Sequence, residues 1–427
     1  MPGRGSPLGA KALERILEVT RDLARPLDID TTLEHVIDAG RSILNAERGT
    51  VFLYDSENDE LVTRVATGAD EFRVPASKGI VGECARTRQV VIVPDCYADS
   101  RFNPEIDRKT GYRTRCLMAV PLIGHDDSLE GVLQVLNKRK GVFGSEDERI
   151  ATALAAQCAV ALQRSRLLRE KVARERLEQE LEVARSIQQR VFPQSMPTMD
   201  DYEVCGWARP ADQTGGDIYD IHLQDDGGLI LLLGDATGHG IGPALSVTQV
   251  RAMLCMCVRF GVDIDHAMQQ INDQLALDLS SNRFVTAFLG RLDRDAHSVV
   301  YHAGGQGPLL HYHAQDDRGE WLTSTTRPLG MLGDLPVGPA HSMELAPGDL
   351  LLLSTDGIFE HERADEEAYG EQRILDVVRR HRDSPLASLI GAVIEDVDRF
   401  GDGAPQLDDM TVVVLRRRLA EKPEKRN

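Results

Sequence analysis

The sequence predicts an α+β protein in which two strand-rich domains are joined by a helix. Five short apolar runs lie between two segments of helical periodicity within the first 165 residues. A stretch rich in Arg, Glu, Gln and Leu then continues without Gly or Pro, and turns that carry Asp adjoin apolar runs in the remainder. Apolar runs bounded by Gly and Asp are typical of strands, and apolar residues three or four apart are typical of helices.

The composition limits the kinds of partner that the protein binds. The chain has 427 residues, which predicts two or three domains, and a formal net charge of −19. This charge disfavours nucleic acid and anionic membrane surfaces as partners, because both attract positive charge. The seven cysteines show no C-x-x-C pair, which is typical of reduced thiols, and no run of about eighteen apolar residues is present. We therefore expect a cytoplasmic protein with no nucleic-acid and no membrane partner.

The first domain is expected over residues 12–165, after a disordered N-terminus over residues 1–11. Apolar residues recur at helical spacing over residues 12–44, and the segment 146–166 returns to this spacing. Between them we predict strands at residues 50–54, 61–66, 90–93, 117–122 and 131–136. This order of a helix, a strand-rich middle and a closing helix predicts an α+β sensor-like domain.

A helical linker is expected over residues 166–192. Its apolar stripe advances in steps of 4, 3, 3 and 4 through Leu177, Leu181, Ala184, Ile187 and Val191. This heptad-like spacing favours a coiled coil in a homodimer, and the alternative is an exposed helix with one face on a neighbouring domain. Pro193 ends the helix because proline cannot continue it. The second domain follows over residues 193–417, and residues 418–427 form a charged tail.

Four turns of the second domain carry aspartates in a way that suggests a metal site. They are Gly215-Gly216-Asp217, Gly234-Asp235-Ala236, Ser354-Thr355-Asp356-Gly357 and Asp408-Asp409. Three of them adjoin strand-like runs at residues 229–233, 350–353 and 411–415. One such turn alone would be an ordinary loop stabilised by an Asx hydrogen bond. Four together predict carboxylates gathered at strand ends, and oxygen ligands are what Mg²⁺ and Mn²⁺ select.

These motifs also carry a resemblance to a known family. The stretches GGDIYD, GDATGHG, PLGML, LLLSTDGIFE and DDMTVVVL resemble the metal-dependent Ser/Thr protein phosphatases of the PPM family, in the SpoIIE-like branch. The resemblance implies a β-sandwich flanked by helices (αββα) that holds two Mn²⁺ or Mg²⁺ ions. It implies that catalysis depends on Asp217 and Asp235, and that the metal ligands are Asp217, Asp235, the Ala236 carbonyl, Asp356 and Asp408. Asp409 is the weaker candidate ligand, with a role behind the ligands or at a third ion as the alternative.

The resemblance further implies a phosphorylated protein substrate, such as an anti-sigma-factor antagonist. One departure from the family pattern is Gly305-Gln306, where His and Asn are usual, and it bears on substrate contacts and loop rigidity. The alternative function is a ligand-binding signalling scaffold with an inactive phosphatase domain. A third hypothesis is a nucleotide cyclase or phosphodiesterase. The sequence after residue 193 lacks the His/Asp metal pattern of a phosphodiesterase, which argues against this hypothesis.

The first domain resembles the GAF domains of cyclic-nucleotide phosphodiesterases and cyclases. The stretch VPDCYADSRFNPEIDRKTGYRTRCLMAVPL carries the resemblance, together with Asn137-Lys138, Phe143 and Asp147-Glu148. We expect Lys138 to pair with Asp147 and to fasten the closing helix over the pocket. The resemblance implies a pocket for a cyclic nucleotide, cAMP or cGMP, lined by Thr50, Val81, Asp107, Thr110, Thr114 and Gln134. The alternatives are another small molecule or no ligand. Without a ligand, Thr50 and Gln134 would be ordinary strand residues, and Asp107 and Thr110 would stabilise loops.

Overall fold

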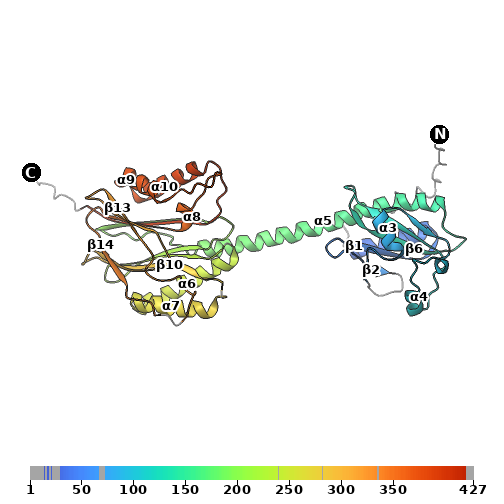
Figure 1. Cartoon of the computed structure of the whole chain (residues 1–427), viewed down its shortest axis with the longest axis horizontal. Helices are drawn as coiled ribbons and strands as arrows, with labels where there is room; N and C mark the ends of the chain where they lie inside the picture. The colour runs from blue at the N-terminus through green and yellow to red at the C-terminus, as the bar shows by residue number, and fades with distance from the viewer. Residues whose placement is uncertain are drawn as a thin grey trace, which may run out of the picture. The chain divides into compact units, whose positions relative to one another are not determined.

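The structure is a computed structural model in which the chain divides into two compact units, Met1–Arg176 and Leu177–Asn427 (Figure 1). It describes Glu14, Leu17, Glu18 and Arg21 and residues 29–66, 73–238, 240–280, 282–333 and 336–419. The predicted disordered N-terminus, most of the first half of the predicted first helix, and the end of the tail lie outside the described residues.

The N-terminal unit is built on one antiparallel sheet of six strands. Its strand order is β3-β2-β1-β6-β5-β4, so that neighbours in space are mostly neighbours in the sequence. The bounds of its elements are α2 Ile29–Ile43, β1 Ala46–Asp55, β2 Glu60–Ala66, β3 Arg73–Pro75, α3 Gly79–Thr87, β4 Val91–Val93, η1 Cys96–Ala98, α4 Glu105–Thr110, β5 Leu117–Ile123, β6 Leu129–Lys138 and α5 Ser145–Gln189. All five predicted strands are present, whereas the short β3, α3 and α4 were not predicted.

The two faces of this sheet pack against different helices. Successive side chains of a strand point to opposite faces, so Leu133 and Val135 of β6 face α2 and α5, while Val132 faces α3. Helix α5 therefore covers the face opposite α3. The expectation that Lys138 fastens α5 over the pocket is wrong in this respect, because the pocket described below lies on the α3 face. The Lys138–Asp147 ion pair itself is present.

Helix α5 is one continuous helix rather than a closing helix followed by a separate linker. It runs over Ser145–Gln189, and the boundary between the two compact units falls inside it. Its beginning packs into the first unit through Ala151, Leu154 and Cys158. Beyond residue 166 it carries exposed apolar side chains, among them Leu177 and Ile187, which are 55% and 60% exposed.

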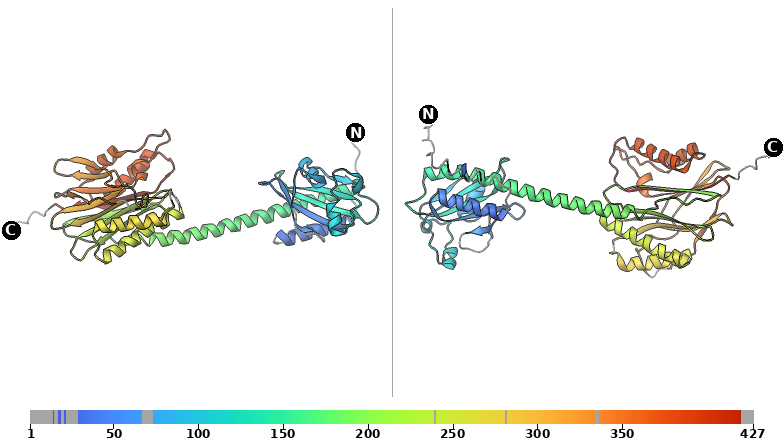
Figure 2. Two further views of the ribbon diagram at one scale, coloured as in Figure 1. Left: turned by 60° about the horizontal axis from the view of Figure 1, so that its bottom comes forward. Right: turned by 180° about the vertical axis from the view of Figure 1, so that it is seen from behind.

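The C-terminal unit is a sandwich of two antiparallel five-stranded sheets covered by helices on both outer faces (Figures 1 and 2). The strand orders are β14-β11-β10-β9-β8 and β13-β12-β15-β16-β7. The bounds are β7 Tyr202–Arg209, β8 Asp217–Leu223, β9 Leu229–Ala236, α6 Ile241–Arg259, α7 Ile264–Asp278, β10 Val285–Asp293, β11 Ser298–Gly304, β12 Leu309–His313, β13 Arg318–Leu322, β14 His341–Glu344, β15 Leu350–Ser354, α8 Asp356–Phe359, α9 Glu371–His381, α10 Leu386–Gly401 and β16 Met410–Arg417.

Three apolar cores hold the four layers together, as the predicted αββα architecture requires. Leu231, Phe288 and Leu351 pack between the sheets. Helices α6 and α7 cover the first sheet and α9 and α10 cover the second. Because β9 is buried on both faces, residues 229–233 form a continuous apolar run rather than an alternating one. Gly234 and Asp235 follow this run within the strand.

Helix α6 is long and apolar enough to span a membrane by length and composition alone. Its buried residues, including Val247, Val250 and Leu254, pack in the core with α7 and the first sheet. Core helices of soluble proteins can have the same length and composition, so this feature is weak evidence for a membrane span.

Candidate metal centre and ligand pocket

Both sheets of the sandwich bring carboxylates to the same end. Asp217 opens β8 and lies directly opposite Asp235 of β9 in the strand register. In the other sheet, Asp356 follows β15 and Asp408 precedes the neighbouring strand β16. The hydroxyl of Thr355 donates a hydrogen bond of 2.7 Å to Asp217 Oδ2 and so connects the two sheets at this point.

Among the residues that the structure describes, the charges that act most strongly on Asp217 and Asp235 are those of neighbouring carboxylates. Burial, followed by the charges of Asp356, Asp408 and Asp409, raises the pKa of Asp235 to about 8. Burial and the charges of Asp235 and Asp409 also raise the pKa of Asp217 well above its usual range. Such a cluster is costly unless protons or cations neutralise it.

Asp408 and Asp409 have different surroundings. Asp408 is exposed, whereas Asp409 is only 3% exposed. The Asp409 carboxylate accepts hydrogen bonds from the backbone N–H groups of Ala211, at 2.6 Å, and of Gly216. The oxygens of Asp409 therefore hold the loop that leads into Asp217, and Asp408 has the more accessible oxygens.

The donor set fits hard divalent cations. Asp217, Asp235, Asp356 and Asp408 offer carboxylate oxygens, which Mg²⁺ and Mn²⁺ prefer. A Cβ on Gly216 would lie 2.8 Å from the Ala236 carbonyl oxygen, so glycine is the residue that keeps the space beside this oxygen open. These five residues would hold the ions, and Asp409 would position the loop behind them.

Gln188 of α5 contacts the loop before Asp217 and was not singled out from the sequence. It is 9% exposed. Its amide nitrogen donates to the Gly215 carbonyl at 2.6 Å, and its amide oxygen accepts from the Gly215 N–H at 3.1 Å. The end of α5 is thereby attached to Gly215, which lies two residues before the candidate metal ligand Asp217. A glutamine within a heptad-like stretch carries no sequence signal for such a contact.

The Gly305-Gln306 departure has a structural role in this sandwich. Gln306 is 3% exposed, donates to the Ser354 carbonyl at 2.9 Å and accepts from the Thr286 hydroxyl at 3.1 Å. Thr286 is the register partner of Asp235, and Ser354 lies two residues before Asp356. Gln306 thus ties together the strand ends that carry these two aspartates.

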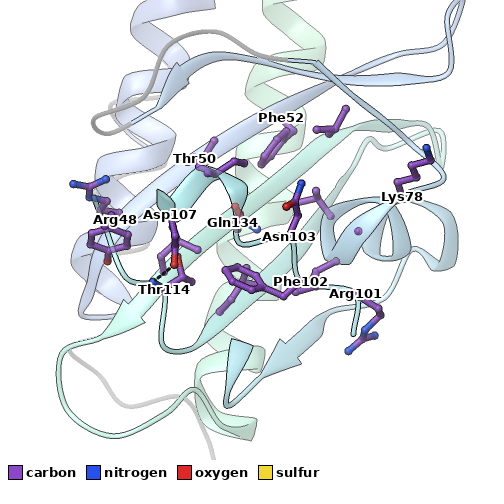
Figure 3. A pocket seen from close by; sticks show the side chains of 18 of the residues that line it. Arg48, Thr50, Phe52, Lys78, Arg101, Phe102, Asn103, Asp107, Thr114 and Gln134 are labelled. Atoms are coloured by element: carbon purple, nitrogen blue, oxygen red, sulfur yellow. Dashed lines mark hydrogen bonds between the residues drawn. The ribbon is translucent and has the colours of Figure 1, made fainter. Parts of the chain in front are cut away.

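The N-terminal unit contains a cavity of about 290 Å³ on the α3 face of its sheet (Figure 3). Five of the six predicted pocket residues line it, namely Thr50, Val81, Asp107, Thr114 and Gln134. The sixth, Thr110, belongs to α4, and its side chain lies outside the described part of the structure. The cavity also has cationic and aromatic lining residues that were not predicted: Arg48, Phe52, Lys78, Arg101, Phe102 and Tyr112.

Asp107 is fully engaged within the protein. Its carboxylate accepts hydrogen bonds from the Thr114 N–H and the Thr114 hydroxyl, both at 2.7 Å, and from the Tyr97 hydroxyl at 3.0 Å. Figure 3 shows this Asp107–Thr114 contact at one side of the cavity. The pair therefore closes the wall of the cavity, while Thr50 and Gln134 stand on the sheet that forms its floor.

The end of β6 connects the cavity wall to α5. The Asn137 side chain accepts from the Arg115 N–H at 2.6 Å and donates to the Arg113 carbonyl at 2.9 Å, which holds the segment around Thr114. The next residue, Lys138, pairs with Asp147 in the first turn of α5. Two adjacent residues thus contact the wall of the pocket and the start of the long helix.

Each of the two units contains a segment that matches a family model. The GAF domain model matches residues 28–162, and the model of Stage II sporulation protein E (SpoIIE) matches residues 225–418. The chain joins a GAF domain to a SpoIIE-type domain. The SpoIIE match includes Asp235, Asp356 and Asp408 and begins after Asp217.

Individual relatives cover parts of the chain. The SiaA-PP2C domain of Pseudomonas aeruginosa has 24% identity and a TM-score of 0.50, covering 57% of this chain and 98% of that domain, which shows the fold. The cGMP-specific 3′,5′-cyclic phosphodiesterases of Drosophila melanogaster and Drosophila pseudoobscura pseudoobscura are each 31% identical over 193 residues. This match covers 41% of the chain and only 17% of each phosphodiesterase.

Proposed function

We propose that the protein is a divalent-metal-dependent phosphoserine/phosphothreonine protein phosphatase whose turnover is controlled by a small ligand in the GAF domain. The observation that carries the proposal is the convergence of Asp217, Asp235, Asp356 and Asp408 at one end of the sandwich. The dominant charged neighbours of Asp235 are carboxylates, which fits a site built for cations.

The chemistry follows from what a phosphate monoester lacks in water. Two Mn²⁺ or Mg²⁺ ions, when bound, would neutralise the phosphoryl oxygens and acidify a water molecule. The chain's own part is to hold the donors: Thr355 orients Asp217, Asp409 fixes the loop before it, and Gln306 ties the strand ends. Such alignment supplies much of the acceleration in phosphoryl transfer.

For the ligand we propose a cyclic nucleotide, cAMP or cGMP. The curated relatives described above are cGMP-specific phosphodiesterases, and the cavity combines hydrogen-bonding side chains at Thr50 and Gln134 with cationic ones at Arg48 and Lys78. Amide and hydroxyl groups suit a purine edge, and cationic groups suit an anionic phosphate.

For the substrate and assembly we propose a phosphorylated signalling protein, such as an anti-sigma-factor antagonist, and a cytoplasmic homodimer formed through α5. The exposed apolar side chains on this helix support pairing: Leu167, Leu168, Val172, Leu177, Val183 and Ile187. Sedimentation of the full chain tests the dimer, and a monomer at micromolar concentration would contradict it.

The decisive experiment is hydrolysis of p-nitrophenyl phosphate and of a phosphoserine protein by the full chain. We expect turnover in the presence of Mn²⁺ and no turnover when a chelator removes the metal. We expect the rate of turnover to change when cAMP or cGMP is added. Absence of metal-dependent hydrolysis of either substrate would favour the alternative, a ligand-binding scaffold with an inactive phosphatase domain. Thermal shift with each nucleotide tests the ligand separately.

A further inference from the structure

A second group of metal-ligand side chains lies at the other end of β15 from Asp356. His311 and His313 belong to β12, and their side chains point to the same face of the sheet because they are two residues apart. Asp349 directly precedes β15. One ligand atom from each of the three side chains lies within 4.8 Å of the others.

The spacing of these atoms resembles the spacing of ligands around a metal ion. Asp349 Oδ2 lies 3.5 Å from His311 Nε2 and 3.8 Å from His313 Nδ1. Hydrogen bonds between nitrogen and oxygen are shorter, about 2.7–3.2 Å. Two ligand atoms bound tetrahedrally to Zn²⁺ at about 2.0–2.1 Å lie about 3.4 Å apart.

His311 is buried with an unsatisfied ring nitrogen. The residue is 5% exposed, and its Nε2 has no hydrogen-bond partner in the described part of the structure. An orphaned buried polar atom is costly and calls for an explanation.

The surroundings hold the other two side chains in place. Asp349 accepts hydrogen bonds from the backbone N–H groups of Ala314, at 2.9 Å, and Ala346, at 3.0 Å. His313 Nε2 lies 3.0 Å from Glu320 Oε2, which leaves its Nδ1 on the side of Asp349. A histidine that contacts a carboxylate through one nitrogen and a metal through the other is the usual arrangement in metal sites. Glu320 also pairs with Arg318 at 3.3 Å.

We propose that His311 Nε2, His313 Nδ1 and Asp349 Oδ2 bind a divalent transition-metal ion such as Zn²⁺, with Glu320 positioning His313. Three protein ligands leave a coordination position for water. The bound ion would join the β12–β13 hairpin to the turn before β15. Its two imidazole donors distinguish it from the oxygen-only cluster at the other end of the strand, so the two sites select different metals.

The group Asp220, His222 and Cys255 has similar spacing but a different charge balance. Arg251 Nε donates to Asp220 Oδ2 at 2.6 Å, and His222 Nε2 lies 2.9 Å from the same oxygen. Asp220 is therefore already neutralised by a permanent cation, and this group carries no metal proposal.

The test uses Co²⁺ as a spectroscopic substitute for Zn²⁺ in the full chain. Excess Mg²⁺ is present to occupy the oxygen-ligand cluster, and Co²⁺ is then titrated in. Tetrahedral Co²⁺ with imidazole ligands absorbs strongly in the visible range, whereas Co²⁺ in a six-oxygen site absorbs weakly. We expect one equivalent of Co²⁺ to give a strong band that Zn²⁺ abolishes.

Variants locate the ion. His313→Gln should abolish the band, and Glu320→Gln should weaken metal affinity by about 10–100-fold. His341→Gln, on the exposed strand β14, is the matched control and should keep the band. His311→Leu removes a ligand while filling the buried space, and it serves if His313→Gln fails to fold by circular dichroism. No strong band in the native protein, or a band that survives in either folded ligand variant, would overturn the proposal.

Discussion

The GAF pocket and the carboxylate cluster both gather polar side chains, but they differ in how these are satisfied. In the pocket, Asp107 accepts hydrogen bonds from Thr114 and Tyr97, so its carboxylate oxygens have partners within the protein. In the cluster, Asp235 faces other carboxylates and its pKa rises to about 8. Under the proposed function, bound cations would neutralise such a cluster.

The largest effect on the carboxylate cluster is expected from Asp235→Ala. Loss of a central ligand should reduce Mn²⁺-dependent turnover by at least about 10²–10³-fold, the range for removing one group that stabilises transition-state charge. Nucleotide binding by the GAF domain should not change. Asp226→Ala, in an exposed turn of the same sheet, is the matched control. Near-normal turnover of Asp235→Ala in saturating Mn²⁺ would show that the metal assignment is wrong.

Gln188→Ala tests whether the cluster depends on α5. Removal of the two hydrogen bonds to Gly215 should lower turnover by about 5–30-fold, corresponding to about 1–2 kcal/mol. The neighbouring Gln189→Ala, whose side chain is exposed, should be close to native. Equal turnover of the two variants would mean that the hydrogen bonds from Ala211 and Gly216 to Asp409 hold this loop without Gln188.

A four-residue insertion after Glu178 alters the helix between the two sites and leaves the residues of both sites unchanged. It rotates the downstream part of α5 by about 40° at 3.6 residues per turn. The ratio of turnover with and without cyclic nucleotide should approach one or invert, while basal turnover persists. A seven-residue insertion keeps the heptad stripe and should retain the ratio better. An unchanged ratio in the four-residue variant would refute transmission through the helix.

Gln134→Leu tests the ligand pocket of the GAF domain. Loss of one hydrogen bond to the ligand should weaken nucleotide affinity by about 2–10-fold, measured by calorimetry. Basal turnover should be native, since Gln134 lies in the other unit. Gln89→Leu, exposed and outside the cavity, controls for the substitution. Unaltered affinity in Gln134→Leu would place the nucleotide elsewhere.

A pH-dependent effect is expected on the stability of the metal-free protein. The folded-state pKa of Asp235, about 8, exceeds the usual unfolded value near 4, so the folded state binds more protons in this window. The contribution of Asp235 to stability is present below about pH 4 and is lost as the pH rises toward 8. Asp235→Asn should therefore gain melting temperature over the native chain as pH rises, when both are metal-free. A difference that does not vary with pH would contradict the raised pKa.

Features that depend on neighbours along the chain could be predicted from the amino-acid sequence. Runs such as residues 229–233 predicted strands, and the aspartates after them predicted a cluster, because strand ends meet at the edge of a sheet. The Lys138–Asp147 pair was also predictable, since nine residues separate its members and each closes or opens an element.

Which elements lie against each other depends on contacts between distant parts of the chain, and the sequence patterns do not show these contacts. Periodicity shows that α5 has a buried face, but not that this face lies on the side of the sheet opposite the pocket. It likewise does not separate Asp408 from Asp409, because their roles depend on backbone N–H groups about 200 residues away. Gln188 on Gly215 and Asp349 beside His311 are contacts of the same kind. Such pairs follow from how layers stack, and stacking depends on the whole set of apolar surfaces rather than on any local pattern.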